Sequence, residues 1–202
     1  YRNIKNAINY LLSGNFAGII CVFIASLLLL PTPFFPVHLL FMNLITDSLP
    51  AIAIGMEAGR NDVLKEKPRQ ANDSILNKTT FLQISYEGIV IAICTMCAYL
   101  TGLKGDPLTA STMAFATICL ARLLHGFNCR SHQPLTKIGF FTNRSSIIAF
   151  IIGFGLLHFI LFVPAMHGLF MIHTISFTQL FIIYGFALLP TIIIQARKML
   201  TK

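Results

Sequence analysis

The stretch "FMNLITDSLPAIAIG", from Phe41 to Gly55, decides how this sequence folds. It lies in a run apolar enough to cross a membrane, yet it contains Asp47 and the helix breaker Pro50. An ionisable side chain at the centre of a bilayer costs about 2.5–3.5 kcal/mol even on insertion-based scales. Because a feature of the fold must offset that cost, we expect this stretch to carry the function.

The composition is typical of a membrane protein. Of the 202 residues, 55% are hydrophobic and 11% are charged, whereas soluble domains have about 25% charged residues. The net charge of +8 does not indicate nucleic-acid binding, because the basic residues lie between apolar runs rather than along one polar face. The CxxC formed by Cys94 and Cys97 lacks the further ligands of a zinc site, so we expect these cysteines to be buried thiols.

Six segments are long and apolar enough to cross a membrane, since a spanning helix needs about 20 mostly apolar residues. They cover approximately residues 7–30, 37–56, 81–102, 110–128, 146–164 and 180–195. We therefore predict an all-α, polytopic membrane protein in which residues 1–202 form one six-helix transmembrane bundle.

The basic residues predict the orientation of the bundle. All of the Lys and Arg residues except Lys104 and Arg122 lie at the two termini or in the loops that connect the spans on the same side. Such an excess marks the cytoplasmic side of a membrane protein. We expect a multi-pass protein of the cell membrane with both termini in the cytoplasm.

Three polar residues of the opening stretch predict a cation site. Asn43, Thr46 and Asp47 are spaced i, i+3 and i+4, which places them on one face of a helix. Pro50 has no N–H, so the carbonyl of Thr46 loses its helical partner. Carboxylate, amide, hydroxyl and carbonyl oxygens are the ligands that Ca²⁺ takes, and broken spanning helices occur where the freed backbone lines a cavity. The alternative is a polar contact between helices with Asp47 protonated or paired.

The preceding span contributes a further candidate ligand. Its "LLSGNFAG" segment combines small residues, which allow helices to approach closely, with Asn15, whose amide oxygen can serve a shared site. Packing alone would explain the glycines but explains Asn15 less well.

Two more charges, Glu87 and Arg122, lie inside spans. Each lies six residues from the expected cytoplasmic end of its span, so our hypothesis is that they form a structural ion pair. The alternatives are that Arg122 extends its side chain to the membrane interface and that Glu87 lies near headgroups or titrates during ion transport.

The residues resemble a known family. "PVHLLFMNLITDSLPAIAIGME" resembles the sixth transmembrane helix of type II P-type ATPases, and "YRNIKNAINYLLSGNFAGIICVF" resembles their stalk and fifth helix. "ARLLHGFNCRS" is similar to the end of the eighth helix and "PLTKIGFFTNRSSIIAF" to the loop that enters the ninth. By this resemblance, the chain is identified as the C-terminal transmembrane domain, helices five to ten, of a cation-transporting P-type ATPase. Within that family it is most similar to calcium pumps, and we expect a bacterial source.

The resemblance implies a calcium site to which Asn43 and Asp47 contribute together with the fourth helix, and a second site faced by Thr46 and Asn15. Within this family, the sarcoplasmic reticulum pump has two calcium sites and carries glutamates at two positions where this chain has Gly18 and Cys119. Because the charge of the ligands sets the affinity for a divalent ion, we predict that one Ca²⁺ is exported per cycle.

The chemistry of ATP hydrolysis is expected elsewhere. Neither a D-K-T-G motif nor a Gly-rich phosphate loop occurs in these residues, so we expect no catalytic residue here. We interpret the chain as a fragment whose partners are the lipid bilayer and the missing N-terminal part of the pump, which holds the first four helices and the sites for ATP and Mg²⁺. The loop from Glu57 to Thr80, with its "KEKPRQ" run, either contacts the phosphorylation domain or is a solvated loop that sets topology.

Other functions stay open at this point. A pump for Mn²⁺, Na⁺, K⁺ or H⁺ would also use an Asn, Thr and Asp face. A self-contained six-span channel or carrier is a second alternative, although the internal repeat typical of carriers is not found. A scaffold role for the last four helices is a third.

Overall fold

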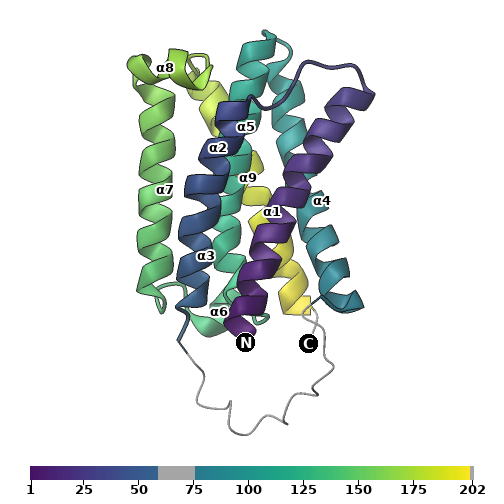
Figure 1. The fold of residues 1–202 in the computed structure, drawn as a ribbon, viewed down its shortest axis with the longest axis vertical. Helices are drawn as coiled ribbons and strands as arrows, with labels where there is room; N and C mark the ends of the chain where they lie inside the picture. Colours follow the sequence, from purple (N-terminus) through teal and green to yellow (C-terminus); the bar gives the residue numbers. More distant parts are fainter. Residues whose placement is uncertain (59–75, 201–202) are drawn as a thin grey trace, which may run out of the picture.

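The computed structural model describes residues 1–58 and 76–200, which form a bundle of long helices (Figure 1). The elements are α1 (Arg2–Leu27), α2 (Pro36–Phe41), the π-helical η1 (Met42–Asp47), α3 (Ser48–Gly55), α4 (Lys78–Gly102), α5 (Pro107–Cys129), α6 (Leu135–Ile138), α7 (Arg144–Phe162), α8 (Pro164–Phe170) and α9 (Phe177–Leu200). These described residues contain no strand. The all-α prediction is therefore confirmed.

The six predicted spans are confirmed as α1, the continuous α2–η1–α3 run, α4, α5, α7 and α9. Each is long and apolar enough to cross a membrane, and its bounds agree with the sequence prediction to within about five residues. The short helices α6 and α8 were not expected, because four and seven residues give too little apolar periodicity to detect. The "KEKPRQ" run lies outside the described residues.

Side-chain caps explain why three spans begin before their apolar runs. Asn77 accepts a hydrogen bond from the backbone N–H of Thr80 at 2.9 Å, which starts α4. Asp106 and Asn143 cap α5 and α7 in the same way. Because caps satisfy the orphan N–H groups of a first helical turn, these helices begin at polar residues that hydropathy alone excludes.

Helix α5 is the centre of the bundle and packs against α1, η1, α3, α4, α7 and α9. Nearly all of its residues are buried, including a series of alanines. Small side chains let neighbouring helices approach closely where lipid supplies no hydrophobic driving force between helices. Polar residues of α5 therefore lie inside the protein rather than in lipid.

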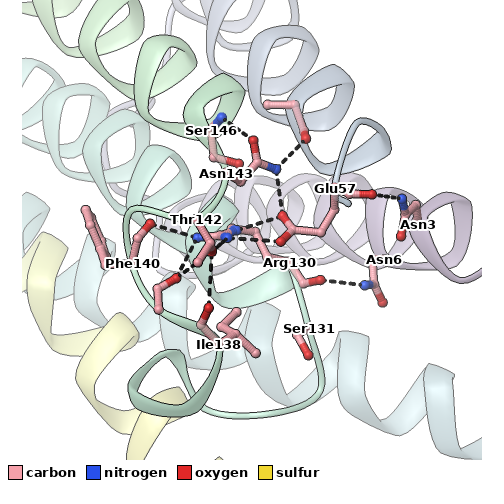
Figure 2. A network of polar contacts seen from close by, with 12 residues as sticks. Asn3, Asn6, Glu57, Arg130, Ser131, Ile138, Phe140, Thr142, Asn143 and Ser146 are labelled. Atoms are coloured by element: carbon pink, nitrogen blue, oxygen red, sulfur yellow. Dashed lines mark hydrogen bonds and ion pairs between the residues drawn. The ribbon is translucent and has the colours of Figure 1, made fainter. Parts of the chain in front are cut away.

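Both termini lie at one end of the bundle, which we call the terminal end (Figure 1). There Arg130 donates hydrogen bonds to both carboxylate oxygens of Glu57, at 2.8 and 3.0 Å. Asn143 donates to the same carboxylate at 2.6 Å, Asn3 donates to the Glu57 carbonyl at 2.7 Å, and Asn6 donates to the Arg130 carbonyl at 3.0 Å. This terminal-end network joins α1, α3, α5 and α7 (Figure 2).

Candidate cation site

The π-helical segment η1 lies where a break in the second span was predicted, and it contains Asn43, Thr46 and Asp47. Pro50, in the following turn, cannot donate to the Thr46 carbonyl, and the hydroxyl of Tyr10 on α1 donates to that carbonyl instead. The Ser48 hydroxyl donates to the carbonyl of Asn43 at 3.0 Å. π-helical segments of this kind are frequent at functional sites. The second span therefore stays helical through Pro50, and the turn just before it is widened to a π-helix.

A cavity of about 610 Å³ lies between α1 and the α2–η1 segment. Its wall is mostly apolar, but it includes the side chains of Asn15, Asn43 and Arg122. Asn15 and Asn43 are both exposed within the described part of the chain. The structure therefore brings two of the predicted ligands to one cavity, from two different helices.

Arg122 of α5 is the cation nearest to the predicted ligands among the described residues. Its Nη1 atom lies 3.2 Å from Oδ1 of Asp47, and its Nη2 atom donates to Oδ1 of Asn15 at 2.7 Å. The side chain of Arg122 is only 2% exposed. Gly14 makes room for it, since a Cβ at that position would lie 2.7 Å from the Arg122 Nε. One guanidinium thus joins α1, η1 and α5.

The ion pair of Asp47 and Arg122 leaves some of their polar atoms without hydrogen bonds. Among the described residues, Oδ1 of Asp47 has no partner with hydrogen-bond alignment, and neither has Nε of Arg122. The 3.2 Å contact is therefore an ion pair rather than an aligned hydrogen bond. An ionised carboxylate has about four acceptor positions, so Asp47 keeps the capacity to bind a further cation.

Thr46 is set apart from this arrangement. It is fully buried, and its hydroxyl donates to the carbonyl of Met42 on its own helix at 2.9 Å. The i, i+3, i+4 spacing places residues on one face of an α-helix, but a π-helical turn contains more residues and rotates them relative to one another. Asn43 therefore faces the cavity, whereas Thr46 faces the protein interior.

The proposed pair of Glu87 and Arg122 is wrong. Glu87 accepts hydrogen bonds from Asn9 at 2.8 Å and Gln83 at 2.9 Å, and its Oε2 lies 3.4 Å from Nε2 of His125. His125 is one turn nearer the terminal end of α5 than Arg122 and lies level with Glu87. Arg122 is consequently one turn deeper, level with Asp47.

Sequence reasoning missed three residues of this region, namely Tyr10, His125 and the role of Arg122 at the cation site. Arg122 is a basic residue within a span, and the sequence contains two carboxylates within spans, Asp47 and Glu87, that could pair with it. The presence of His125 three residues later was the usable signal, because it offers Glu87 a different partner. Tyr10 gave no comparable signal.

The two departures from the two-site pattern occupy different places. Gly18 lines the cavity, and a Cβ there would meet no described atom within 4 Å. Cys119 is fully buried in the hydrophobic core. Neither position supplies a carboxylate to the cavity.

Comparison with known proteins gives a consistent result. The family model for "Cation transporting ATPase, C-terminus" matches residues 31–200. The chain is 37% identical to calcium-transporting ATPase 1 of Bacillus cereus over 96% of its own length, and 33% identical to the calcium-transporting ATPase of Bacillus subtilis over all of it. It is 28% identical to human calcium-transporting ATPase type 2C member 1 over 92% of its length. The chain spans 23% of each Bacillus protein and 20% of the human one.

Proposed function

The chain belongs to the family of cation-transporting ATPase C-terminal domains, and we propose from that premise that it is the membrane-embedded ion-binding part of an ATP-driven Ca²⁺ pump. It is a multi-pass membrane protein, and its relatives are named for calcium transport. Because the chain spans only 23% of the two Bacillus relatives, ATP hydrolysis with Mg²⁺ is assigned to the rest of the pump. The partners of this chain are then the first four helices, the ATP-hydrolysing domains and the lipid bilayer.

The orientation of the bundle follows from its basic residues. The terminal end holds both described chain ends and, of the Lys and Arg residues that the structure describes, all except Arg122 inside the bundle and Lys104 at the opposite end. The positive-inside rule assigns such an end to the cytoplasm. We place the pump in the cell membrane with both termini of this chain cytoplasmic.

The observation that carries the proposal is the cavity beside the η1 break. Asn43 and Asn15 line it, the Asn15 amide oxygen accepts a hydrogen bond from Arg122, and the Asp47 carboxylate lies on the same π-helical segment as Asn43. Hard oxygen ligands of mixed kind suit Ca²⁺, and a break in a spanning helix frees backbone carbonyls to add to them. Further ligands would come from the fourth helix of the complete pump.

The contacts of Arg122 support transport of one divalent ion per cycle. Asn15, a predicted ligand of a second ion, already accepts a hydrogen bond from Arg122, and the Thr46 hydroxyl is bonded within its own helix. The fixed positive charge of Arg122 also disfavours binding of a divalent cation at Asn15. Gly18 and Cys119 provide no compensating negative charge.

The other functions are less well supported. Mn²⁺ and monovalent ions are compatible with oxygen ligands, but the two Bacillus relatives are named for calcium. A self-contained channel or carrier does not agree with membership of an ATPase family.

The test uses the full-length protein with Asp47→Asn. We expect the apparent Ca²⁺ affinity, measured from Ca²⁺-stimulated ATPase activity, to fall at least about tenfold, because the number of charged ligands sets the affinity. Asp106→Asn is the matched control, since it makes the same chemical change at the start of α5 and Asn also caps helices. Undiminished Ca²⁺ stimulation in Asp47→Asn would contradict the site.

Ion counting tests the stoichiometry separately. Radiotracer Ca²⁺ bound to the purified full-length protein should saturate at one ion per molecule. Two ions per molecule would contradict the role given to Arg122. The same assay with Mn²⁺, Na⁺ and K⁺ distinguishes the alternative cargoes.

A further inference from the structure

A second polar cluster lies inside the bundle, nearer the terminal end than the cavity. It consists of Glu87 on α4 and of His125 and Cys129 on α5, and all three are buried. The carboxylate oxygen, ring nitrogen and sulfur all lie within 4.8 Å of one another. Ser13 and Asn9 of α1 complete the surroundings. The proposed transport function makes no use of this cluster.

Nε2 of His125 makes three close contacts that a single hydrogen atom cannot serve together. This nitrogen lies 3.0 Å from the Ser13 hydroxyl, 3.2 Å from the Cys129 sulfur and 3.4 Å from the Glu87 carboxylate. A protonated ring nitrogen carries one hydrogen and serves one of the three, whereas an unprotonated one presents a lone pair to the carboxylate. In either state at least one of these close contacts is not a hydrogen bond, although Ser13 and Glu87 also have other partners.

Two further polar atoms beside the cluster lack partners. Within the described ranges, Oδ1 of Asn9 and Nδ1 of His125 are buried without a hydrogen bond. Buried polar atoms are normally paired, and exceptions call for an explanation. The Asn9 amide already contacts Glu87 and the Cys129 sulfur through its nitrogen, so rotation of the amide would turn Oδ1 toward the cluster.

The donor set matches a borderline-soft divalent metal. Zn²⁺ binds thiolate sulfur at about 2.3 Å and imidazole nitrogen or carboxylate oxygen at about 2.0–2.2 Å in tetrahedral geometry. Such a tetrahedron separates its ligand atoms by about 3.3–3.7 Å, and two of the separations here are 3.2 and 3.4 Å. Ca²⁺ takes oxygen ligands only, so this cluster excludes the cargo proposed for the cavity.

We propose that Glu87, His125 and Cys129 form a Zn²⁺ site, with the Ser13 hydroxyl or a water in the fourth position. The site joins α4 to α5, because His125 and Cys129 are one turn apart on the same face of α5 and Glu87 faces them from α4. Binding displaces the thiol proton, since the thiolate is the metal-binding form. Bound metal would therefore hold α4 against the central helix.

The route to the site begins at the terminal end. A cavity of about 160 Å³ reaches Glu87 and is also lined by Gln83, His132, Ile194, Arg197 and Lys198. The basic side chains in this lining oppose the entry of a free cation, so we expect slow loading. A metal that enters slowly and is held by buried ligands would be retained in the protein rather than transported.

The test measures Zn²⁺ binding by the full-length protein, purified without a tag, reduced and stripped with a chelator. Competition against a chromophoric chelator gives the affinity and stoichiometry. We expect Cys129→Ser to lose at least about 100-fold in affinity for one Zn²⁺, more than the roughly 10–100-fold typical of outer-shell changes. Cys97→Ser is the matched control, because it removes a partly exposed α4 thiol outside the cluster and should leave that affinity unchanged.

A second variant keeps the proposal testable if Cys129→Ser does not fold. Glu87→Gln retains the shape of the side chain but removes the charged ligand, and it should also weaken the same Zn²⁺ by at least about tenfold. Co²⁺ bound to the unmodified protein should show thiolate-to-metal charge-transfer absorption. Zn²⁺ affinity that survives both substitutions, or Co²⁺ binding without that absorption, would overturn the site. Either result would leave the proposal of Ca²⁺ transport standing, because the two proposed sites share no ligand.

Discussion

Arg122 on α5 holds its guanidinium 3.2 Å from the carboxylate of Asp47 on η1, and the same guanidinium donates to Asn15 on α1. This relationship places a permanent positive charge among the predicted cation ligands. The ion pair also offsets part of the free-energy cost of burying the Asp47 carboxylate in an apolar span. The cation site and the structural core of the bundle therefore share one ion pair.

Replacement of Arg122 tests that double role. Arg122→Gln should lower the thermal stability of the Ca²⁺-free full-length protein, since loss of one member of a buried pair costs about 3–5 kcal/mol. Added Ca²⁺ should then raise the melting temperature more than in the unmodified protein, because the cation no longer competes with a guanidinium. Thermal unfolding with and without Ca²⁺ measures both effects. Arg144→Gln, at an exposed position, is the control. If Ca²⁺ raised the melting temperature equally in Arg122→Gln and in the unmodified protein, competition between Arg122 and Ca²⁺ would be excluded.

The contact between Tyr10 and the Thr46 carbonyl gives a prediction about the helix break. Tyr10→Phe should destabilise the protein by about 1–3 kcal/mol, because a buried carbonyl freed by Pro50 loses its donor. In a Pro50→Ala background the same change should cost less, since residue 50 then has an N–H to donate. Denaturant unfolding of the four proteins of this double-mutant cycle measures the coupling. Strictly additive effects would show that the hydroxyl does not replace the missing helical donor.

Gly14 provides a test of packing around Arg122. A Cβ at this position would lie 2.7 Å from the Arg122 Nε, so Gly14→Ala should displace the guanidinium and lower the melting temperature. Gly155 is the matched control, because a Cβ there meets no described atom within 4 Å and Gly155→Ala should stabilise α7 by about 0.5–1 kcal/mol. Thermal unfolding of both variants measures the contrast. Similar effects of the two substitutions would mean that α1 does not pack closely on Arg122.

The terminal-end network predicts a dependence of stability on pH. Burial raises the pKa of Glu57, but hydrogen bonds from Arg130 and Asn143 and the charge of Arg130 outweigh it, so the net pKa lies below 4.5. Because the unfolded state then binds protons more readily, stability from this group is complete above about pH 4.5 and is lost as the pH falls through the folded-state pKa.

The measurement is denaturant unfolding of the full-length protein in micelles as a function of pH. Glu57→Gln removes the titrating group but keeps an oxygen that Arg130 can bind, so its stability should change less between neutral and acidic pH. Arg130→Lys should raise the pKa of Glu57, because a lysine cannot donate to both carboxylate oxygens in parallel. An acid response in Glu57→Gln as steep as in the unmodified protein would rule out this carboxylate as its source.

The spans and the break were accessible to sequence reasoning because both depend on local chemistry. Twenty apolar residues require a helix of membrane length wherever they occur, and Pro50 removes an N–H whatever surrounds it. The spacing of Asn43, Thr46 and Asp47 predicted that they share one face of a helix, and all three lie on η1. Local rules could not indicate that a π-helical turn directs Thr46 away from the cavity.

The partners of the buried charges were decided only by the tertiary structure. Sequence placed Glu87 and Arg122 at similar depths, but pairing depends on the relative height and rotation of helices, and a shift of one turn changes the partner. In the structure Arg122 lies against Gly14 and beside Asp47, while His125 lies beside Glu87. The amino-acid sequence determined six spans and an oxygen-rich irregularity in the second. Contacts between helices distant in the chain determined that Arg122, rather than another basic residue, lies beside Asp47 in that segment.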